Sequence, residues 1–361
     1  MERSVLIVGN FLSASGGSRG VCEELAERLV GTGWRVLTAS RKRPKVFRLA
    51  DMVLSAVKHR HEYSIAQVDV FSGPAFFFAE AVGCTLRRLK KPYVLTLHGG
   101  SLPEFAQRWP RRVRQLLASA YVVTAPSGYL KQRLEPYCDH IRILPNALDV
   151  TAYPYRERGP ARPKLVWLRS FHEVYNPAMA VSVVAALVQK YPEVQLSMIG
   201  PDKGDGSWER ARAEVARLGL ANHVKFAGQV MKKEVPNVIA AGDIFLNTTS
   251  IDNTPVSVIE AMACGLGVVS TRVGGTPYLI DHEQNGLLVE SGDTNAMAAS
   301  VGRFLEDEAL TRRCSQGARR KIEAWDWPTV LSEWDSLLRS GMTKSSPRLS
   351  PCWATPGRTR D

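Results

Sequence analysis

Two acidic side chains, Asp252 and Glu260, flank a predicted helix start, with seven residues between them. Val256, Ser257 and Val258 are expected to open that helix, where their backbone N–H groups would be free. The positive end of a helix dipole suits a phosphate, and carboxylates accept hydrogen bonds from hydroxyls. These groups could therefore hold the phosphates and hydroxyls of a nucleoside diphosphate-sugar, although acids are also common near helix starts simply because they favour the dipole.

Two further places could contribute to a site in the first half of the chain. Gly16 and Gly17 lie between a predicted strand and a predicted helix, where their amides could approach phosphate or sugar. A nicotinamide-dinucleotide site is disfavoured, because its glycine fingerprint should directly follow the strand. His98 follows the predicted strand Tyr93–Leu97 and precedes two glycines, so its ring should emerge at the carboxyl end of that strand. A lone histidine is often structural.

Short apolar runs alternate with amphipathic helical stretches along the whole chain, which predicts parallel sheets with helices on both faces. A segment rich in proline and charge, Thr151–Pro163, interrupts this alternation and is interpreted as a linker. Two doubly wound α/β units are therefore expected, with ligands beyond the carboxyl ends of the strands. The predicted strands are Val5–Val8, Val36–Thr38, Val68–Phe71, Tyr93–Leu97, Tyr121–Thr124, Ile141–Leu144, Leu165–Leu168, Gln195–Ile199, Val224–Ala227, Ile244–Leu246, Val268–Thr271 and Leu287–Val289.

The length of 361 residues fits two domains, predicted at residues 1–160 and 161–340, followed by a basic tail at 341–361 that we expect to be disordered. The net charge of +12 is concentrated in the first domain, where residues 1–160 hold 24 Lys and Arg against 13 Asp and Glu. Basic clusters occur at Arg41–Arg48, Arg87–Lys91 and Arg108–Arg114. They indicate an anionic partner such as a membrane surface, or merely a solvated face. No nucleic-acid-binding module accompanies them.

Several classes of protein are disfavoured by what the sequence lacks. The six cysteines are far apart and form no C-x-x-C pair, which argues against zinc or a disulfide framework and favours a reducing compartment. No Asp-x-Asp follows a strand, so no metal site is predicted. No apolar run is long enough for a signal peptide or a membrane span, and a cytoplasmic location is expected.

The motif around Asp252 carries a resemblance to a known family. Asp252 and Glu260 are followed by Ala-Met-Ala-Cys-Gly at 261–265, by Val-Gly-Gly at 273–275 and by Asn-Gly-Leu-Leu-Val at 285–289. This ordered set resembles glycosyltransferase family 4, retaining enzymes of the GT-B fold with two Rossmann-like domains that face a cleft. The resemblance implies a donor site in the second domain and an acceptor site in the first. The last helix, near residues 327–338, is expected to pack against a domain and could cross back to the first.

The resemblance also implies roles for single residues. Glu260 would bind the donor ribose, Asp252 the transferred sugar, and Arg169 the departing diphosphate. Gly200 and Lys203, after the strand Gln195–Ile199, are assigned to the donor as well, and His98 to the reactive face of the sugar. The family usually has a lysine about five residues after the arginine; this chain has none there, and Lys203 or His172 could replace it.

The function predicted from the resemblance is a metal-independent, retaining hexosyltransferase without a cofactor. Its donor would be a UDP-, GDP- or ADP-sugar and its acceptor a glycan or a lipid-linked molecule, in polysaccharide or glycoconjugate biosynthesis at the inner face of a membrane. Two alternatives stay open. One is a sugar-nucleotide 2-epimerase of the same architecture, and the other is a degenerate, membrane-associated binding subunit.

Overall fold

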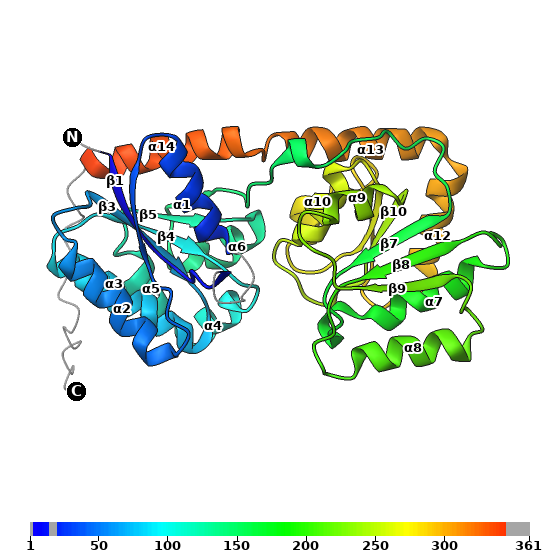
Figure 1. Cartoon of the computed structure of the whole chain (residues 1–361), viewed down its shortest axis with the longest axis horizontal. Coiled ribbons are helices and arrows are strands. Elements are labelled where there is room, and N and C mark those ends of the chain that lie inside the picture. The colour runs from blue at the N-terminus through cyan, green and yellow to red at the C-terminus, as the bar shows by residue number, and fades with distance from the viewer. Residues whose placement is uncertain (1–2, 14–19, 344–361) are drawn as a thin grey trace, which may run out of the picture. The chain divides into compact units, whose positions relative to one another are not determined.

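The computed structural model describes residues 3–13 and 20–343, and the chain divides into two compact units (Figure 1). Unit 1 runs to Pro145 and resumes at Val330, whereas unit 2 is Asn146–Thr329. The boundary predicted after residue 160 is therefore too late, and residues 330–340 belong to unit 1 rather than to the second domain. Residues 341–343 of the predicted tail are helical, and the rest of that tail lies outside the described residues.

Unit 1 contains a six-stranded parallel sheet in the order β2-β1-β3-β4-β5-β6. Helices α2 and α3 lie side by side on one face of this sheet, and α1 lies on the other (Figure 1). The strands are β1 Ser4–Val8, β2 Arg35–Ala39, β3 Ile65–Val70, β4 Tyr93–Leu97, β5 Val122–Ala125 and β6 Ile141–Ile143. The helices are α1 Val21–Gly31, α2 Lys45–Lys58, α3 Phe76–Arg88, α4 Leu102–Arg108, α5 Pro110–Leu117 and α6 Gly128–Leu134.

Unit 2 contains a second six-stranded parallel sheet, in the order β12-β11-β10-β7-β8-β9. This order reverses direction between β7 and β10, which makes that pair the topological switch point. The strands are β7 Lys164–Leu168, β8 Gln195–Ile199, β9 Val224–Gly228, β10 Ile244–Asn247, β11 Gly267–Thr271 and β12 Leu287–Val289. The helices are α7 Pro177–Leu187, α8 Ser207–Arg217, α9 Val235–Ala240, α10 Val256–Ala263, α11 Thr276–Leu279, α12 Thr294–Glu306 and α13 Glu308–Glu323.

Each predicted strand corresponds to an observed one, because the runs of buried β-branched and aliphatic residues that predicted them form the cores of the two sheets. The last helix, α14 Trp327–Thr343, starts in unit 2 and continues into unit 1, as the sequence allowed. There the indole N–H of Trp34 donates to Asp335 at 2.8 Å. A Cβ on Gly341 would stand 2.4 Å from the Ile65 side chain, so glycine permits this close packing.

The segment interpreted as a linker, Thr151–Pro163, is instead part of unit 2. Its residue Arg158 is fully buried and donates to the carbonyl oxygens of Cys264, Ala240 and Gly242, at the ends of α10 and α9. The prediction was wrong because the proline-rich composition indicated exposure, whereas the arginine finds partners that are distant in sequence.

Two findings concern cysteine and membranes. The cysteines of the described residues, Cys22, Cys84, Cys138, Cys264 and Cys314, are all free thiols. Within residues 3–13 and 20–343, no helix has both the length and the apolar character that crossing a membrane requires.

Candidate active site

The switch point of unit 2 brings three of the predicted site residues together. Arg169 directly follows β7, and Asp252 lies in the loop after the neighbouring strand β10. Nη2 of Arg169 donates to Oδ2 of Asp252 in an ion pair whose side chains are only 16% and 14% exposed. Glu260, in α10, contributes to the electrostatic environment of Arg169. The carboxyl ends of two adjacent strands therefore bring together Arg169 and Asp252, two of the residues that the resemblance assigned to the donor, and α10 adds Glu260.

The Arg169 side chain is a hydrogen-bond donor that is largely buried and held by its neighbours. Its guanidinium lies over the ring of Tyr175, with 4.6 Å between its central carbon and the ring centroid. Its Nε is buried and has no hydrogen-bond partner within the part of the chain that the structure describes. Burial lowers the pKa of Arg169, against the opposing effect of Tyr175 and Glu260. An arginine pKa lies so high that the group stays charged, and one of its donors is left for another acceptor.

Glu260 is a buried carboxylate with one fixed partner. The hydroxyl of Tyr153 donates to its Oε1 at 2.8 Å. Burial raises the pKa of Glu260, and the Tyr153 hydrogen bond and the charges of Lys232 and Arg169 oppose that rise. Tyr153 and Lys232 were missed from the sequence: Tyr153 lies in the supposed linker, and Lys232, in the loop after β9, belongs to no recognised pattern.

Two glycines fix the loop that carries Asp252. The amide of Gly275 donates to the backbone oxygen of Asp252 at 2.9 Å. A Cβ on Gly274 would stand 1.9 Å from that same oxygen, and one on Gly275 would stand 1.5 Å from the backbone oxygen of Asn253. Any side chain would clash with this backbone. The Val-Gly-Gly sequence is therefore required so that the loop after β11 can approach the loop of Asp252.

The start of α10 differs in one respect from the expectation. The amide of Val258 donates to the carbonyl of Pro255 at 3.1 Å, so it is not free as predicted, because the first turn is tightened. The amides of Val256 and Ser257 have no such bond among the described residues. Oγ of Ser257 and Oγ1 of Thr254 are also buried without a partner there.

Unpartnered buried polar atoms concentrate at this place. The described residues contain five such side-chain atoms, and three of them belong to Arg169, Thr254 and Ser257. Native proteins pair almost all buried polar groups. A polar ligand that accepts from Arg169 and from the start of α10 would satisfy this cluster.

The other residues assigned to the donor contribute less directly. Gly200 has φ +144°, and a Cβ there would stand 1.8 Å from the backbone oxygen of Arg169, so glycine lets the loop after β8 pass close to Arg169. Lys203 is exposed, and its backbone amide donates to the carbonyl oxygen of Phe171 at 3.2 Å. His172 accepts a hydrogen bond from the amide of Val174, and its Nε2 lies 3.8 Å from Asp205. Neither is placed against Asp252 or Glu260 by these contacts.

In unit 1, His98 forms a separate group of polar contacts. Its Nε2 lies 2.9 Å from Oδ1 of Asp69, which also accepts from Nε2 of Gln67 at 2.8 Å. Its ring is stacked on Phe71, with centroids 4.9 Å apart. Asp69 and Phe71 line a pocket at the carboxyl ends of β1 and β3. Gly16 and Gly17, predicted to join this site, lie outside the described residues.

Replacing Asp69 with asparagine is expected to remove the contact that fixes the tautomer of the His98 ring. An ionised carboxylate only accepts, so it places the imidazole hydrogen on Nε2 and leaves the Nδ1 lone pair available. Nitrogen-15 NMR should show the Nε2–H tautomer in the native protein and a mixture in Asp69→Asn, and the transfer activity that the resemblance implies should fall about 10- to 100-fold. Asp139→Asn, which alters an exposed Asp–His pair, is the control; an unchanged His98 spectrum in Asp69→Asn would contradict the assignment.

No group of three or more His, Cys, Asp or Glu side chains that could hold a metal ion occurs within the described ranges.

Two family models match the chain. One described as glycosyl transferases group 1 matches residues 157–321, and one described as glycosyltransferase family 4 matches residues 15–152. Among relatives, N-acetyl-alpha-D-glucosaminyl L-malate synthase from Bacillus anthracis is 32% identical over 265 residues, 68% of this chain and 66% of that protein. A D-inositol 3-phosphate glycosyltransferase from Corynebacterium jeikeium is 28% identical over 198 residues, 53% of this chain and 47% of that protein. The chain spans 37% to 64% of the length of three such D-inositol 3-phosphate enzymes.

Solved structures agree on the fold. Anabaena HepE in complex with UDP has a TM-score of 0.77 and 19% identity, over 94% of this chain and 100% of that chain. Sucrose-phosphate synthase from Thermosynechococcus elongatus has a TM-score of 0.73 and 19% identity, over 94% and 99% of the two chains. With two parallel sheets, the acidic motif at a switch point and matches to both family models, the chain belongs to glycosyltransferase family 4 and has the GT-B fold.

Proposed function

We propose that this protein transfers a sugar, with retention of configuration and without a metal ion, from a nucleoside diphosphate-sugar bound to unit 2. The observation that carries the proposal is the set of buried polar atoms on Arg169, Thr254 and Ser257, which have no hydrogen-bond partner among the described residues and lie beside two carboxylates. A diphosphate supplies acceptors for these donors, and its neighbouring hydroxyls supply donors for the acids. HepE, which shares the fold, was solved with UDP and with UDP-glucose.

The site residues would stabilise the negative charge that develops as the bond between the sugar and the diphosphate of the donor breaks. When the glycosidic bond to phosphate lengthens, negative charge grows on the leaving diphosphate. Arg169 and the amides of Val256 and Ser257 stabilise that charge, while Glu260 accepts from the ribose and Asp252 from the transferred sugar. Because interactions that strengthen in the transition state accelerate the reaction, Arg169 contributes most to the rate. In a front-face transfer, the departing phosphate itself takes the proton of the acceptor hydroxyl.

Arg169 can contact Asp252 and the diphosphate at the same time. Nη2 of Arg169 faces Asp252, whereas its Nε has no partner in the described part of the chain. A guanidinium carries five N–H donors in a rigid fork, so one group can contact the acid and a phosphate together. Lys232, whose charge acts on Glu260, is better placed than Lys203 to add a second positive charge.

The acceptor side of the proposal rests on unit 1. The related enzymes are named for different acceptors, among them inositol phosphate and malate. We assign to this chain a glycan or a lipid-linked acceptor, bound by unit 1 near His98, in glycoconjugate or polysaccharide synthesis at the cytoplasmic face of a membrane.

Calorimetry with UDP, GDP and ADP tests the donor site directly. One of the three is expected to bind the native protein, and Glu260→Gln, which keeps the size of the side chain, should weaken that binding about 10-fold or more. Glu209→Gln, on the exposed face of α8, is the matched control and should bind as the native protein does. If no nucleotide binds the folded protein, the proposal fails; if the donor is only epimerised and never transferred, the retaining transferase is wrong.

A further inference from the structure

The solvent face of α2 is apolar. The exposed residues of this helix are two lysines and five apolar residues, and none is acidic: Lys45, Val46, Phe47, Ala50, Leu54, Val57 and Lys58. The large apolar side chains are strongly exposed to solvent: Val46 is 78% exposed, Phe47 66% and Leu54 64%. Val46, Phe47, Leu54 and Val57 are called the apolar stripe below.

The apolar stripe is not the face that α2 turns toward its own core. Met52 and Ala56 are the buried residues of the helix, and they pack into the core of unit 1. Helical rotation places Phe47 and Leu54 on the opposite side. A surface helix normally presents polar residues there. The neighbouring helix α3, which packs against α2, also carries an exposed aromatic residue, Phe77, which is 52% exposed.

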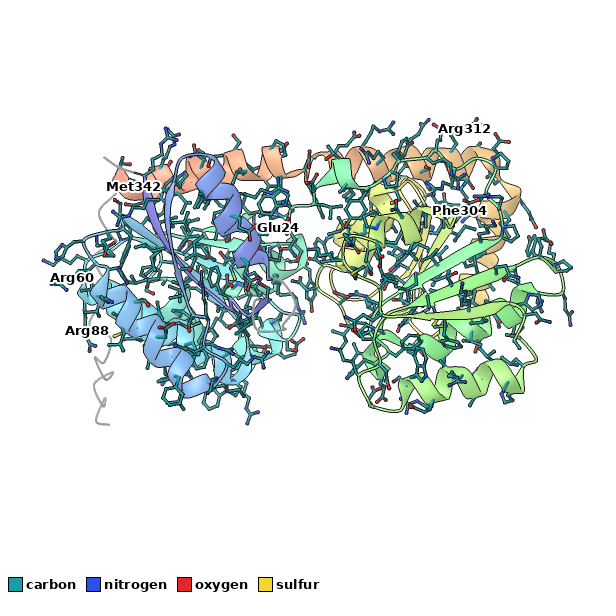
Figure 2. All side chains as sticks on the ribbon, viewed as in Figure 1. Glu24, Arg60, Arg88, Phe304, Arg312 and Met342 are labelled. Atoms are coloured by element: carbon teal, nitrogen blue, oxygen red, sulfur yellow. The ribbon has the colours of Figure 1, made fainter. Side chains whose placement is uncertain are left out.

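Basic groups lie at both ends of the apolar stripe. Before α2, Arg41, Lys42 and Arg43 are exposed, and Arg48 fixes this segment: its Nε donates to the oxygen of Lys42 and its Nη2 to that of Arg43, each at 2.8 Å. At the other end, exposed cations end α2, follow it and end α3: Lys58, Arg60 and Arg88, of which Arg60 and Arg88 are labelled in Figure 2.

Acidic groups do not neutralise these cations. Asp51, the acid of α2 itself, is only partly exposed and forms no ion pair with any residue that the structure describes. Glu62, beyond the helix, already has two partners: its Oε2 lies 2.6 Å from Nη2 of Arg35, and its Oε1 lies 2.8 Å from Nδ1 of His59. The surface around the apolar stripe is therefore strongly positive.

We propose that the apolar stripe and its flanking cations dock unit 1 on an anionic lipid bilayer. Exposed Phe, Leu and Val side chains enter the region between headgroups and acyl chains, and Lys and Arg on either side contact anionic headgroups. A second copy of this chain is a poorer occupant, because two such surfaces would bring cations against cations. The surface goes beyond the proposed function, since it uses no residue of the donor site, and it would bring unit 1 to a lipid-linked acceptor.

Vesicle sedimentation tests the docking surface. The native protein is expected to bind vesicles that contain phosphatidylglycerol, to bind pure phosphatidylcholine vesicles weakly, and to be released as salt is raised. The double variant Phe47→Glu with Leu54→Glu should lose about tenfold or more of the vesicle affinity. Val30→Glu, at an apolar position on α1 that is 58% exposed, is the matched control and should bind like the native protein.

Two further measurements keep the outcomes separate. If the double variant does not fold, as judged by circular dichroism, Phe47→Ser with Leu54→Ser replaces it. Nucleotide binding should be equal in all variants, so a failure of donor binding is distinguished from a failure of docking. Absence of native binding to anionic vesicles, or binding that the variants leave unchanged, would overturn the proposal. So would a native dimer that the double variant dissociates, because the occupant would then be a second copy.

Discussion

Replacing Arg169 with alanine is expected to lower kcat/KM for sugar transfer about 100- to 1,000-fold, the usual cost of removing one fixed donor from developing negative charge. Arg169 is largely buried, stacked on Tyr175 and ion-paired with Asp252, so it is already oriented before a donor arrives. Such orientation avoids reorganisation during the reaction, which makes the loss larger than a surface cation would give. Steady-state kinetics with the donor identified by calorimetry gives the ratio.

Three companion variants separate an effect on the reaction from an effect on folding. Arg169→Lys keeps the charge but loses the planar fork and the contact with the Tyr175 ring, so it should recover only part of the rate. Arg320→Ala removes an exposed arginine of α13 and should leave kcat/KM unchanged. Arg169→Ala leaves Asp252 without its partner, and thermal unfolding measured on Arg169→Ala with Asp252→Asn reveals any cost of that. Transfer at the native rate by folded Arg169→Ala would show that another group stabilises the diphosphate.

Arg169, Asp252 and Glu260 could be singled out from the sequence because each lies in a short, ordered stretch of motif or strand. Asp252 and Glu260 lie within one loop and one helix, and Arg169 follows a strand whose buried residues are unmistakable. That Arg169 and Asp252 contact each other depends on the pairing of β7 with β10, a strand order that the sequence analysis did not predict.

Contacts between distant segments could not be predicted in this way. Tyr153 reaches Glu260 from a stretch whose prolines indicated a linker, and nothing in its local sequence names that partner. Asp69 orients His98 across two strands, which requires the register of β3 and β4. The first turn of α10 also tightened around Val258, a detail of backbone geometry that residue types do not determine.

The burial of Asp243 gives the second large prediction, on stability. This carboxylate is fully buried after α9 and is surrounded by three arginines of the supposed linker: Arg156, Arg158 and Arg162. Arg162 donates to it through its backbone amide at 2.8 Å and through Nε at 2.7 Å. Asp243→Asn removes the negative charge and leaves buried Arg158 uncompensated. We expect a loss of about 3 to 5 kcal/mol in the free energy of unfolding, measured in urea.

Asp243 should also make the free energy of unfolding depend on pH in the acidic range. Burial alone would raise the pKa of Asp243, but the hydrogen bonds from Arg162 and Arg156 outweigh it and lower the pKa to about 2. An unfolded Asp has a pKa of about 4, so the folded state gains stability above that pH and loses it as the pH falls from about 4 to about 2. The free energy of unfolding of the native protein should therefore fall more steeply with decreasing pH than that of Asp243→Asn.

The control for the stability prediction is Glu157→Gln, which breaks an exposed pair with Arg312 and should lower the free energy of unfolding by less than about 1 kcal/mol. Equal urea midpoints for Asp243→Asn and Glu157→Gln would mean that the buried cluster does not hold the segment to unit 2.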